Sequence, residues 1–204
     1  MARGGEVLVF GVPRGGVVVA AEVARALDAP LDVLVTRRLY SPHNPSAALG
    51  AVAETGAVFL NEAMVRFAGV QPSELTEPIM REALEVERQA RRYREGRSRL
   101  EVEGRIVVLV DDGLITGATA RAAIIALRTL SPKRLVLAVP LAEAEGAEAI
   151  RPAVDALVVT HQPPELGSLP RWYEHFGIVS DGEVMEVLAR GRRAAEAALD
   201  AALP

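Results

Sequence analysis

The chain has 204 residues, the length of a single domain, and because half of it is apolar and 25% is charged it can bury a sizeable core. It contains 0 cysteines and 3 histidines, which excludes disulfides and cysteine-ligated metal centres and disfavours a histidine-rich metal cage. The net charge of −4 disfavours nucleic acid as a partner, and no apolar run approaches the ~20 residues of a membrane span, so we expect a cytoplasmic protein without membrane contact.

The first elements are predicted to form a β–α–β unit. Glu6 to Val12 is a near-continuous apolar run, typical of a buried strand, and it ends in the turn Pro13-Arg14-Gly15-Gly16. A helix is expected from Val17 to Leu27 and a second strand from Leu31 to Arg37. The crossover of such a unit is right-handed, and its two strands are parallel.

A loop and a hairpin are expected next. Tyr40 to Leu49 is rich in proline, serine and asparagine, which favours a loop. Gly50 to Glu54 and Ala57 to Leu60 are predicted to pair as short strands around Thr55 and Gly56. Asn61 then caps a brief helix that runs to Phe67.

Residues 61–104 are predicted to be a helical insertion dominated by one long helix. This helix is expected to open at Thr76 and to run to about Arg99. Its apolar positions recur every three or four residues, at Ile79, Ala83, Val86, Ala90 and Tyr93. The other faces carry arginine and glutamate, which favours solvated ion pairs beside a packing or dimer stripe, with a polyanion-binding face as the alternative.

Strands and helices alternate in the second half. The expected elements are a strand from Arg105 to Val110, a helix from Thr119 to Leu130, a strand from Arg134 to Val139, a helix from Glu143 to Ile150 and a strand from Asp155 to Thr160. Residues 161–177 are irregular, and Ser180 with Glu183 forms a capping box for the last helix. The alternation predicts an α/β fold in a single domain, residues 1–204, with a mostly parallel central sheet and helices on both faces. The active site of such a sheet lies beyond the carboxyl ends of its strands.

The stretch from Val107 to Thr119 carries most of the chemical information. An apolar strand ends in two carboxylates, Asp111 and Asp112, and the small-residue turn Thr116-Gly117-Ala118-Thr119 then opens a helix. Free amides at a helix N-terminus favour phosphate, and small residues let it approach the backbone. The carboxylates lie too near a phosphate to bind it, so they are expected to face hydroxyl groups or a metal. The pattern predicts a ligand with a phosphate and a diol, a ribose 5-phosphate.

These thirteen residues resemble the signature with which type I phosphoribosyltransferases bind 5-phosphoribosyl 1-pyrophosphate (PRPP). The segments Arg-Arg-Leu, Pro-x-Asn-Pro and Leu-Gly-Ala-Val-Ala-Glu within residues 37–54 are similar to a poorly characterised bacterial branch. The resemblance implies that family's fold, with a small hood. It implies that Asp111 and Asp112 are catalytic and hold the ribose 2- and 3-hydroxyls, directly or through Mg²⁺ as cofactor. It also implies that Thr116, Gly117, Ala118 and Thr119 wrap the 5-phosphate.

The loop after the first strand binds pyrophosphate in that family and often contains a non-proline cis peptide. The resemblance therefore assigns Arg14, Gly15 and Gly16 to the pyrophosphate, and we predict a cis bond between Pro13 and Arg14. Taken alone, Pro-Arg-Gly-Gly is more typical of a plain turn.

Two arginines follow one another at the end of the second predicted strand. Paired arginines at a strand's carboxyl edge are unfavourable to bury without an anion, and the family places basic pyrophosphate contacts here. Arg37 is therefore predicted to bind pyrophosphate and Arg38 to act in catalysis, with a surface ion pair as the alternative for Arg38. Tyr40 and His43 are either acids or contacts of the site, or plain loop surface.

The acceptor signal is weaker. Family members that salvage 6-oxopurines carry an acid immediately before the Thr-Gly pair, where this chain has Ile115, so hypoxanthine and guanine are disfavoured. The candidate hood is residues 161–177. Within it, Trp172, Tyr173 and Phe176 either stack on the acceptor or anchor the segment onto the core. Ile115, Trp172 and Tyr173 are the candidate acceptor contacts.

The resemblance implies an enzyme that transfers the 5-phosphoribosyl group of PRPP to a nucleobase or similar nitrogen acceptor and releases pyrophosphate. The alternative is a non-catalytic regulator of the same fold that senses PRPP or nucleotides. The expected partners are small molecules, PRPP and an unidentified acceptor, and a homodimer is the candidate assembly.

Overall fold

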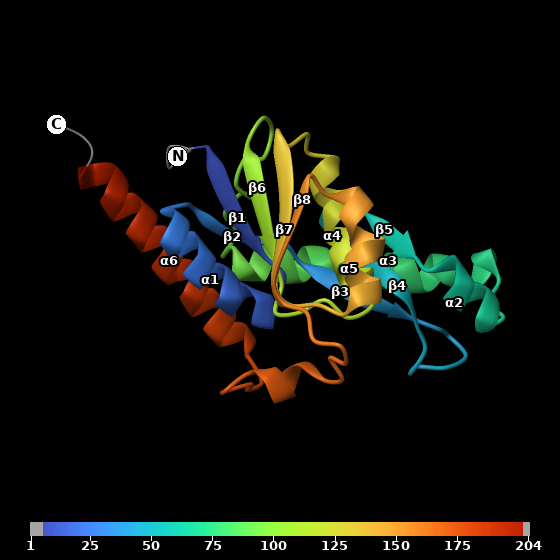
Figure 1. The fold of residues 1–204 in the computed structure, drawn as a ribbon. Coiled ribbons are helices and arrows are strands. Elements are labelled where there is room, and N and C mark those ends of the chain that lie inside the picture. The colour runs from blue at the N-terminus through green and yellow to red at the C-terminus, as the bar shows by residue number, and fades with distance from the viewer. Residues whose placement is uncertain (1–5, 202–204) are drawn as a thin grey trace.

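Five parallel strands form the central sheet of the computed structural model, which describes residues 6–201 (Figure 1). The strands lie in the order β2-β1-β6-β7-β8, and each neighbouring pair is parallel. Their bounds are Val7–Gly11 for β1, Leu31–Val33 for β2, Ile106–Val110 for β6, Arg134–Leu141 for β7 and Ala156–His161 for β8. The predicted α/β class with a mostly parallel sheet is confirmed. Residues 1–5 and 202–204 of the predicted domain lie outside the described residues.

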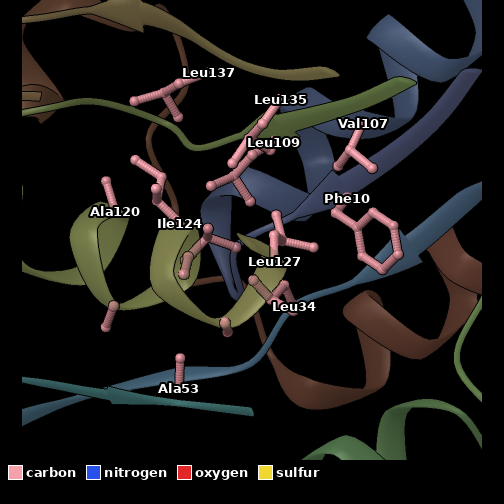
Figure 2. Close-up of a cluster of buried hydrophobic side chains, with 14 of the residues drawn as sticks. Phe10, Leu34, Ala53, Val107, Leu109, Ala120, Ile124, Leu127, Leu135 and Leu137 are labelled. Carbon is pink, nitrogen blue, oxygen red and sulfur yellow. The ribbon is translucent and has the colours of Figure 1, made fainter. Parts of the chain in front are cut away.

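Helices cover both faces of this sheet. They are α1 (Gly15–Leu27) and α6 (Asp181–Ala201) on one face, and α4 (Ala118–Arg128) and α5 (Ala144–Ile150) on the other. Successive strand residues point to opposite faces, so Val9 packs with α1 and α6 while Phe10 packs in the cluster around α4 (Figure 2). Burial on both faces explains the near-continuous apolar runs of β1 and β6.

A second, antiparallel sheet follows β2. It holds β3 (Thr36–Tyr40), β4 (Ala48–Ala53) and β5 (Val58–Leu60), in that order. The predicted hairpin is present as β4 and β5, with a 3-10 turn at Glu54–Gly56 between them. This sheet packs against α4 on the side away from the central strands, where Ala53 joins the same apolar cluster as Phe10.

The prediction of one strand from Leu31 to Arg37 is wrong. β2 ends at Val33, and β3 begins at Thr36 in the other sheet. The amide of Leu34 still bonds to the carbonyl oxygen of Gly11, at 2.9 Å, but the amide of Val35 donates to a carboxylate oxygen of Glu54 instead of to a strand. The apolar run continues across this crossover because its residues are buried, so hydrophobicity alone did not reveal the break.

The helical insertion contains α2 (Glu62–Phe67) and α3 (Pro72–Tyr93). Asn61 caps α2 as predicted, by accepting from the amide of Met64. The predicted bounds of the long helix are wrong at both ends. The helix starts at Pro72, where Gln71 and Glu74 form a capping box, which leaves Pro78 inside it. It ends at Tyr93, before Glu95 and Gly96, which adopt positive φ. The predicted apolar stripe faces the core beside α1 and α6, so it is a packing stripe.

The segment after β8 is irregular, as predicted, apart from a short 3-10 turn at Leu169–Trp172. A similar turn at Arg151–Ala153 lies between α5 and β8. Ser180 and Glu183 form the predicted capping box at the start of α6. None of the helices described within residues 6–201 combines the length and the apolar character needed to cross a membrane.

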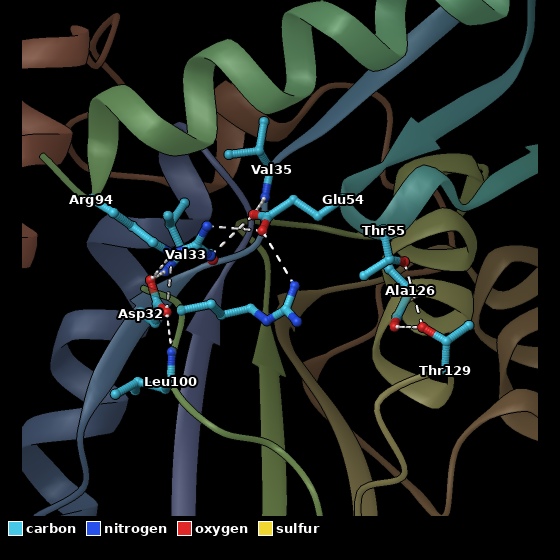
Figure 3. Close-up of polar contacts among 10 residues, drawn as sticks. Asp32, Val33, Val35, Glu54, Thr55, Arg94, Leu100, Ala126 and Thr129 are labelled. Atoms are coloured by element: carbon cyan, nitrogen blue, oxygen red, sulfur yellow. Dashed lines mark hydrogen bonds and ion pairs between the residues drawn. The ribbon is translucent and has the colours of Figure 1, made fainter. Parts of the chain in front are cut away.

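The buried side chain of Arg94 joins the two sheets (Figure 3). Its Nε donates to Oδ1 of Asp32 on β2 at 2.9 Å, and its Nη1 donates to Oε2 of Glu54, which follows β4, at 2.9 Å. All three side chains are nearly inaccessible to solvent. A planar guanidinium group held by two carboxylates fixes direction as well as distance. The cluster therefore fixes where β3, which carries Arg38, lies relative to the central sheet.

Candidate active site

A cavity of about 250 Å³ lies at the carboxyl ends of β1 and β6. Its lining comes from three stretches of chain and one side chain after β8, namely residues 12–15, Thr36 with Arg38, residues 111–119, and Leu169. This is the edge of a parallel sheet at which ligands of α/β proteins bind. The cavity brings together most of the residues that the sequence singled out.

The acid pair lies at the end of β6, where Asp111 is buried and Asp112 is partly buried. Burial, and then the charge of Asp112, raises the pKa of the Asp111 carboxyl well above its usual range, while the charge of Arg38 opposes this rise. Burial also raises the pKa of the Asp112 carboxyl. Hydroxyl donors or a cation would stabilise the ionised form of two carboxyls held together in this way.

Residues 116–119, here called the 116–119 loop, are the turn before α4 and the first two residues of that helix, and all four line the cavity. Gly117 has φ 74°, a left-handed conformation that favours glycine, and its carbonyl oxygen accepts from the amide of Arg121 at 2.8 Å. The first amides of α4 have no partner within the helix. Together with the hydroxyls of Thr116 and Thr119 they form a set of donors suited to an anion.

The loop after β1 approaches the acid pair from the other side. The peptide bond between Pro13 and Arg14 is cis, as predicted. Gly15 lines the cavity, whereas Gly16 does not and instead packs on Asp111, where an added Cβ would lie 2.8 Å from the Cα atom of Asp111. Arg14 lines the cavity, but its Nη1 donates to the carbonyl oxygen of Val179 at 3.2 Å.

Arg37 and Arg38 both lie on β3, and their side chains point to opposite faces of it. Neighbouring residues of a strand point to opposite faces, so Arg38 lines the cavity while Arg37 turns to α3 and pairs with Glu82, Nε to Oε2, at 2.6 Å. The structure therefore does not bring Arg37 into the cavity. Thr36 lines the cavity and was missed, although it shares a strand face with Arg38.

The loop after β3 does not reach the cavity. His43 pairs with Glu74 at the start of α3, Nε2 to Oε1, at 2.9 Å. Neither His43 nor Tyr40 is among the lining residues. Within the described residues, no group of three or more histidine, aspartate or glutamate side chains is arranged to hold a metal ion by itself.

Residues 2–165 match the sequence profile of the phosphoribosyl transferase domain. The chain belongs to the phosphoribosyl transferase family. It is 40% identical over 201 residues to a Mycobacterium tuberculosis protein that bears the provisional name phosphoribosyl transferase. The match covers 98% of this chain and 45% of that protein, so the chain spans less than half the length of the curated relative.

One solved structure is similar to this chain over most of its length. A protein from Thermus thermophilus is 38% identical, with a TM-score of 0.76, and the match covers 91% of this chain and 88% of that one. The resemblance of the acid pair and the Thr-Gly loop to type I phosphoribosyltransferases is thereby confirmed at the level of family and fold.

The candidate hood of this phosphoribosyl transferase fold meets the site through one unexpected residue. Leu169 lines the cavity and packs closely on Gly113, where an added Cβ would overlap Cδ2 of Leu169. Sequence reasoning missed Leu169, since an isolated leucine in a proline-rich stretch gives no signal of its own. Ile115, the candidate acceptor contact predicted alongside Trp172 and Tyr173, also lines the cavity.

Trp172, Tyr173 and Phe176 do not line the cavity, and it is Tyr173 that ties the segment to the end of β6. Trp172 donates from Nε1 to the carbonyl oxygen of Leu166 at 2.8 Å, and its ring lies 5.2 Å from that of His161, between ring centres. The Tyr173 hydroxyl donates to the backbone carbonyl oxygen of Asp112 at 2.5 Å. Burial, and then the charge of Asp112, raises the pKa of Tyr173 to about 12, so the hydroxyl keeps its proton.

Proposed function

We propose that this protein is a PRPP-dependent phosphoribosyltransferase that passes the 5-phosphoribosyl group to a nitrogen acceptor and releases pyrophosphate. The observation that carries the proposal is one cavity lined both by a carboxylate pair and by the amides of the 116–119 loop. A phosphorylated pentose presents a diol to the first and a phosphate to the second. Membership of the phosphoribosyl transferase family supports the same substrate class.

In this proposal the 116–119 loop binds the 5-phosphate, with the donors of α4 directed at an anion. Asp111 and Asp112 accept hydrogen bonds from the ribose 2- and 3-hydroxyls. Because their pKa values are raised, both carboxyls are more costly to ionise in the free protein than in water, and hydroxyl donors compensate for part of that cost.

Mg²⁺ is the metal that the family implies, and the donor set fits it. Mg²⁺ retains several waters and takes substrate phosphate oxygens, so one or two carboxylates suffice and no all-protein cage is needed. Asp111 and Asp112 would hold it, directly or through the ribose hydroxyls. When bound, the ion supplies positive charge beside the pyrophosphate.

Cleavage of the anomeric C–O bond leaves positive charge on the ribosyl carbon and negative charge on pyrophosphate. The protein's task is to fix both ends and to stabilise the departing charge. Arg38, the amides of Arg14 and Gly15, and the guanidinium group of Arg14 are the groups for that task near the acid pair. Arg37 has no such role in the observed arrangement, because Glu82 holds it on α3.

On the acceptor side the cavity offers Leu114, Ile115 and Leu169, which are apolar. We propose that the acceptor enters between this patch and the acid pair. Family members that salvage 6-oxopurines typically carry an acid where this chain has Ile115, so nitrogen acceptors other than hypoxanthine and guanine fit better.

The test is incubation of the protein with PRPP, Mg²⁺ and single nucleobases while pyrophosphate release is followed. Release with one base identifies the acceptor. Tight PRPP binding without release on any base would favour the regulatory alternative. Absence of PRPP binding would contradict the proposal.

A further inference from the structure

Asp181, the first residue of α6, is outside the cavity lining yet faces the guanidinium group of Arg14. Nε of Arg14 lies 3.9 Å from Oδ1 of Asp181, and Nη1 donates to the carbonyl oxygen of Val179 at 3.2 Å. The side chain of Arg14 therefore reaches from the loop after β1 to the start of α6. About half of the Arg14 side chain is exposed, and these are the polar contacts that its guanidinium group makes with the described residues.

The carboxylate of Asp181 is held in turn by α3. The Tyr93 hydroxyl donates to Oδ1 at 2.7 Å, and Nη1 of Arg92 donates to Oδ2 at 3.0 Å. The Tyr93 side chain is fully buried, with its ring in the core cluster of α1 and α6. Two exposed side chains hold each other weakly, because both are mobile. A carboxylate fixed by a buried phenol is a firmer anchor for Arg14.

We propose that Asp181 is a positioning residue for Arg14, which it orders beside the cavity before a pyrophosphate group binds. The inference rests on the proposed function, since it takes the pyrophosphate of PRPP as the anion that Arg14 meets. A free arginine loses rotamer freedom when it binds an anion, and ordering it in advance reduces that loss. A carboxylate that acted only through its charge would weaken anion binding by repulsion, so the two effects have opposite signs.

The experiment measures the binding of inorganic pyrophosphate and, separately, of ribose 5-phosphate by titration calorimetry in the presence of Mg²⁺. Asp181→Ala removes the contact and the charge. Asp181→Asn removes the charge but keeps an oxygen that accepts from Tyr93. We expect Asp181→Ala to weaken pyrophosphate binding about fivefold and Asp181→Asn to weaken it less. Ribose 5-phosphate binding stays unchanged in both variants, because that ligand belongs to the 116–119 loop.

Glu183→Ala is the matched control in the same helical turn. Glu183 accepts from the amide of Ser180 at 2.7 Å and from its hydroxyl at 2.8 Å, and not from Arg14. Its loss removes the capping box, while Asp181 keeps its bonds to Tyr93 and Arg92 of α3. Pyrophosphate binding should not change in this variant. Unchanged or tighter pyrophosphate binding in Asp181→Ala, or an equal loss in Glu183→Ala, would overturn the inference.

The wild-type protein separates the two hypotheses. If it binds ribose 5-phosphate but not pyrophosphate, the inference about Asp181 is wrong and the sugar-phosphate site stands. If it binds neither ligand, the proposed function is contradicted and the inference fails with it.

Discussion

Gly15 in the loop after β1 lies directly against the carboxylate of Asp112 at the end of β6, so close that a Cβ on residue 15 would overlap Oδ2. The turn after β1 and the turn after β6 therefore pack on each other at a position where a larger residue would have to displace the Asp112 carboxylate.

Gly15→Ala is expected to weaken PRPP binding by about tenfold or more, because the added methyl group displaces the Asp112 carboxylate or the loop that faces it. Calorimetric titration with PRPP and Mg²⁺ measures the change. Gly177→Ala is the control, since an added Cβ there meets no atom within 4 Å. PRPP affinity that is the same in both variants would show that the contact has no part in the site.

Asp111→Asn is expected to raise thermal stability at neutral pH while weakening PRPP binding. The folded protein raises the pKa of this carboxyl by burial and by the charge of Asp112, so the folded state binds its proton more tightly than the unfolded chain does. Stability is then lost as the pH rises from the unfolded value through the raised pKa. The amide of Asn has no charge to bury and can still accept from the amide of Asp112. The melting temperatures of the wild-type protein and of Asp111→Asn, measured from acid to neutral pH, should therefore diverge as the pH rises.

Asp155→Asn is expected to change the melting temperature at neutral pH in the opposite direction. The amide of Leu135, and then Arg128, lowers the pKa of the Asp155 carboxyl. Its stabilising effect is present above the unfolded pKa and is lost as the pH falls, so removal of its charge should lower the melting temperature at neutral pH. If Asp111→Asn also lowered the melting temperature at neutral pH, the buried charge of Asp111 would not destabilise the folded protein as argued.

Arg94→Ala is expected to cost about 3–5 kcal/mol of unfolding free energy, because it leaves Asp32 and Glu54 buried without a partner. Urea unfolding measures the loss. Arg25→Ala removes an exposed pair with Glu22 and should cost under about 1 kcal/mol. A loss in Arg94→Ala no larger than in Arg25→Ala would mean that the cluster does not hold the two sheets together.

The acid pair and the 116–119 loop could be predicted because they are contiguous in the sequence. One strand, one turn and one helix place them, and local rules are sufficient for such a unit. The parallel sheet was equally accessible, since its strands are buried on both faces and stand out as apolar runs.

Other parts of the site depend on contacts between distant segments. Thr36 and Leu169 reach the cavity only because β3 crosses to a second sheet and the segment after β8 folds back on Gly113. To choose between Arg37 and Arg38, one must know which face of β3 points to the cavity. The break between β2 and β3 lies where Arg94, distant in the sequence, bonds to Asp32 and Glu54. No local pattern contains that information.

A comparison of Gly117→Ala with Gly104→Ala should distinguish a general effect of backbone strain from a specific effect on phosphate binding. Gly117 has φ 74°, and an added Cβ would lie 3.2 Å from Cγ1 of Ile150, so the substitution strains the turn and distorts the donors of the 116–119 loop. Gly104 has φ 69° with nothing within 4 Å of an added Cβ, so Gly104→Ala introduces a similar strain away from the site. Both variants should lose about 1 kcal/mol of stability, measured by urea unfolding. Only Gly117→Ala should lose affinity for ribose 5-phosphate, and an equal affinity in the two variants would place the sugar phosphate elsewhere.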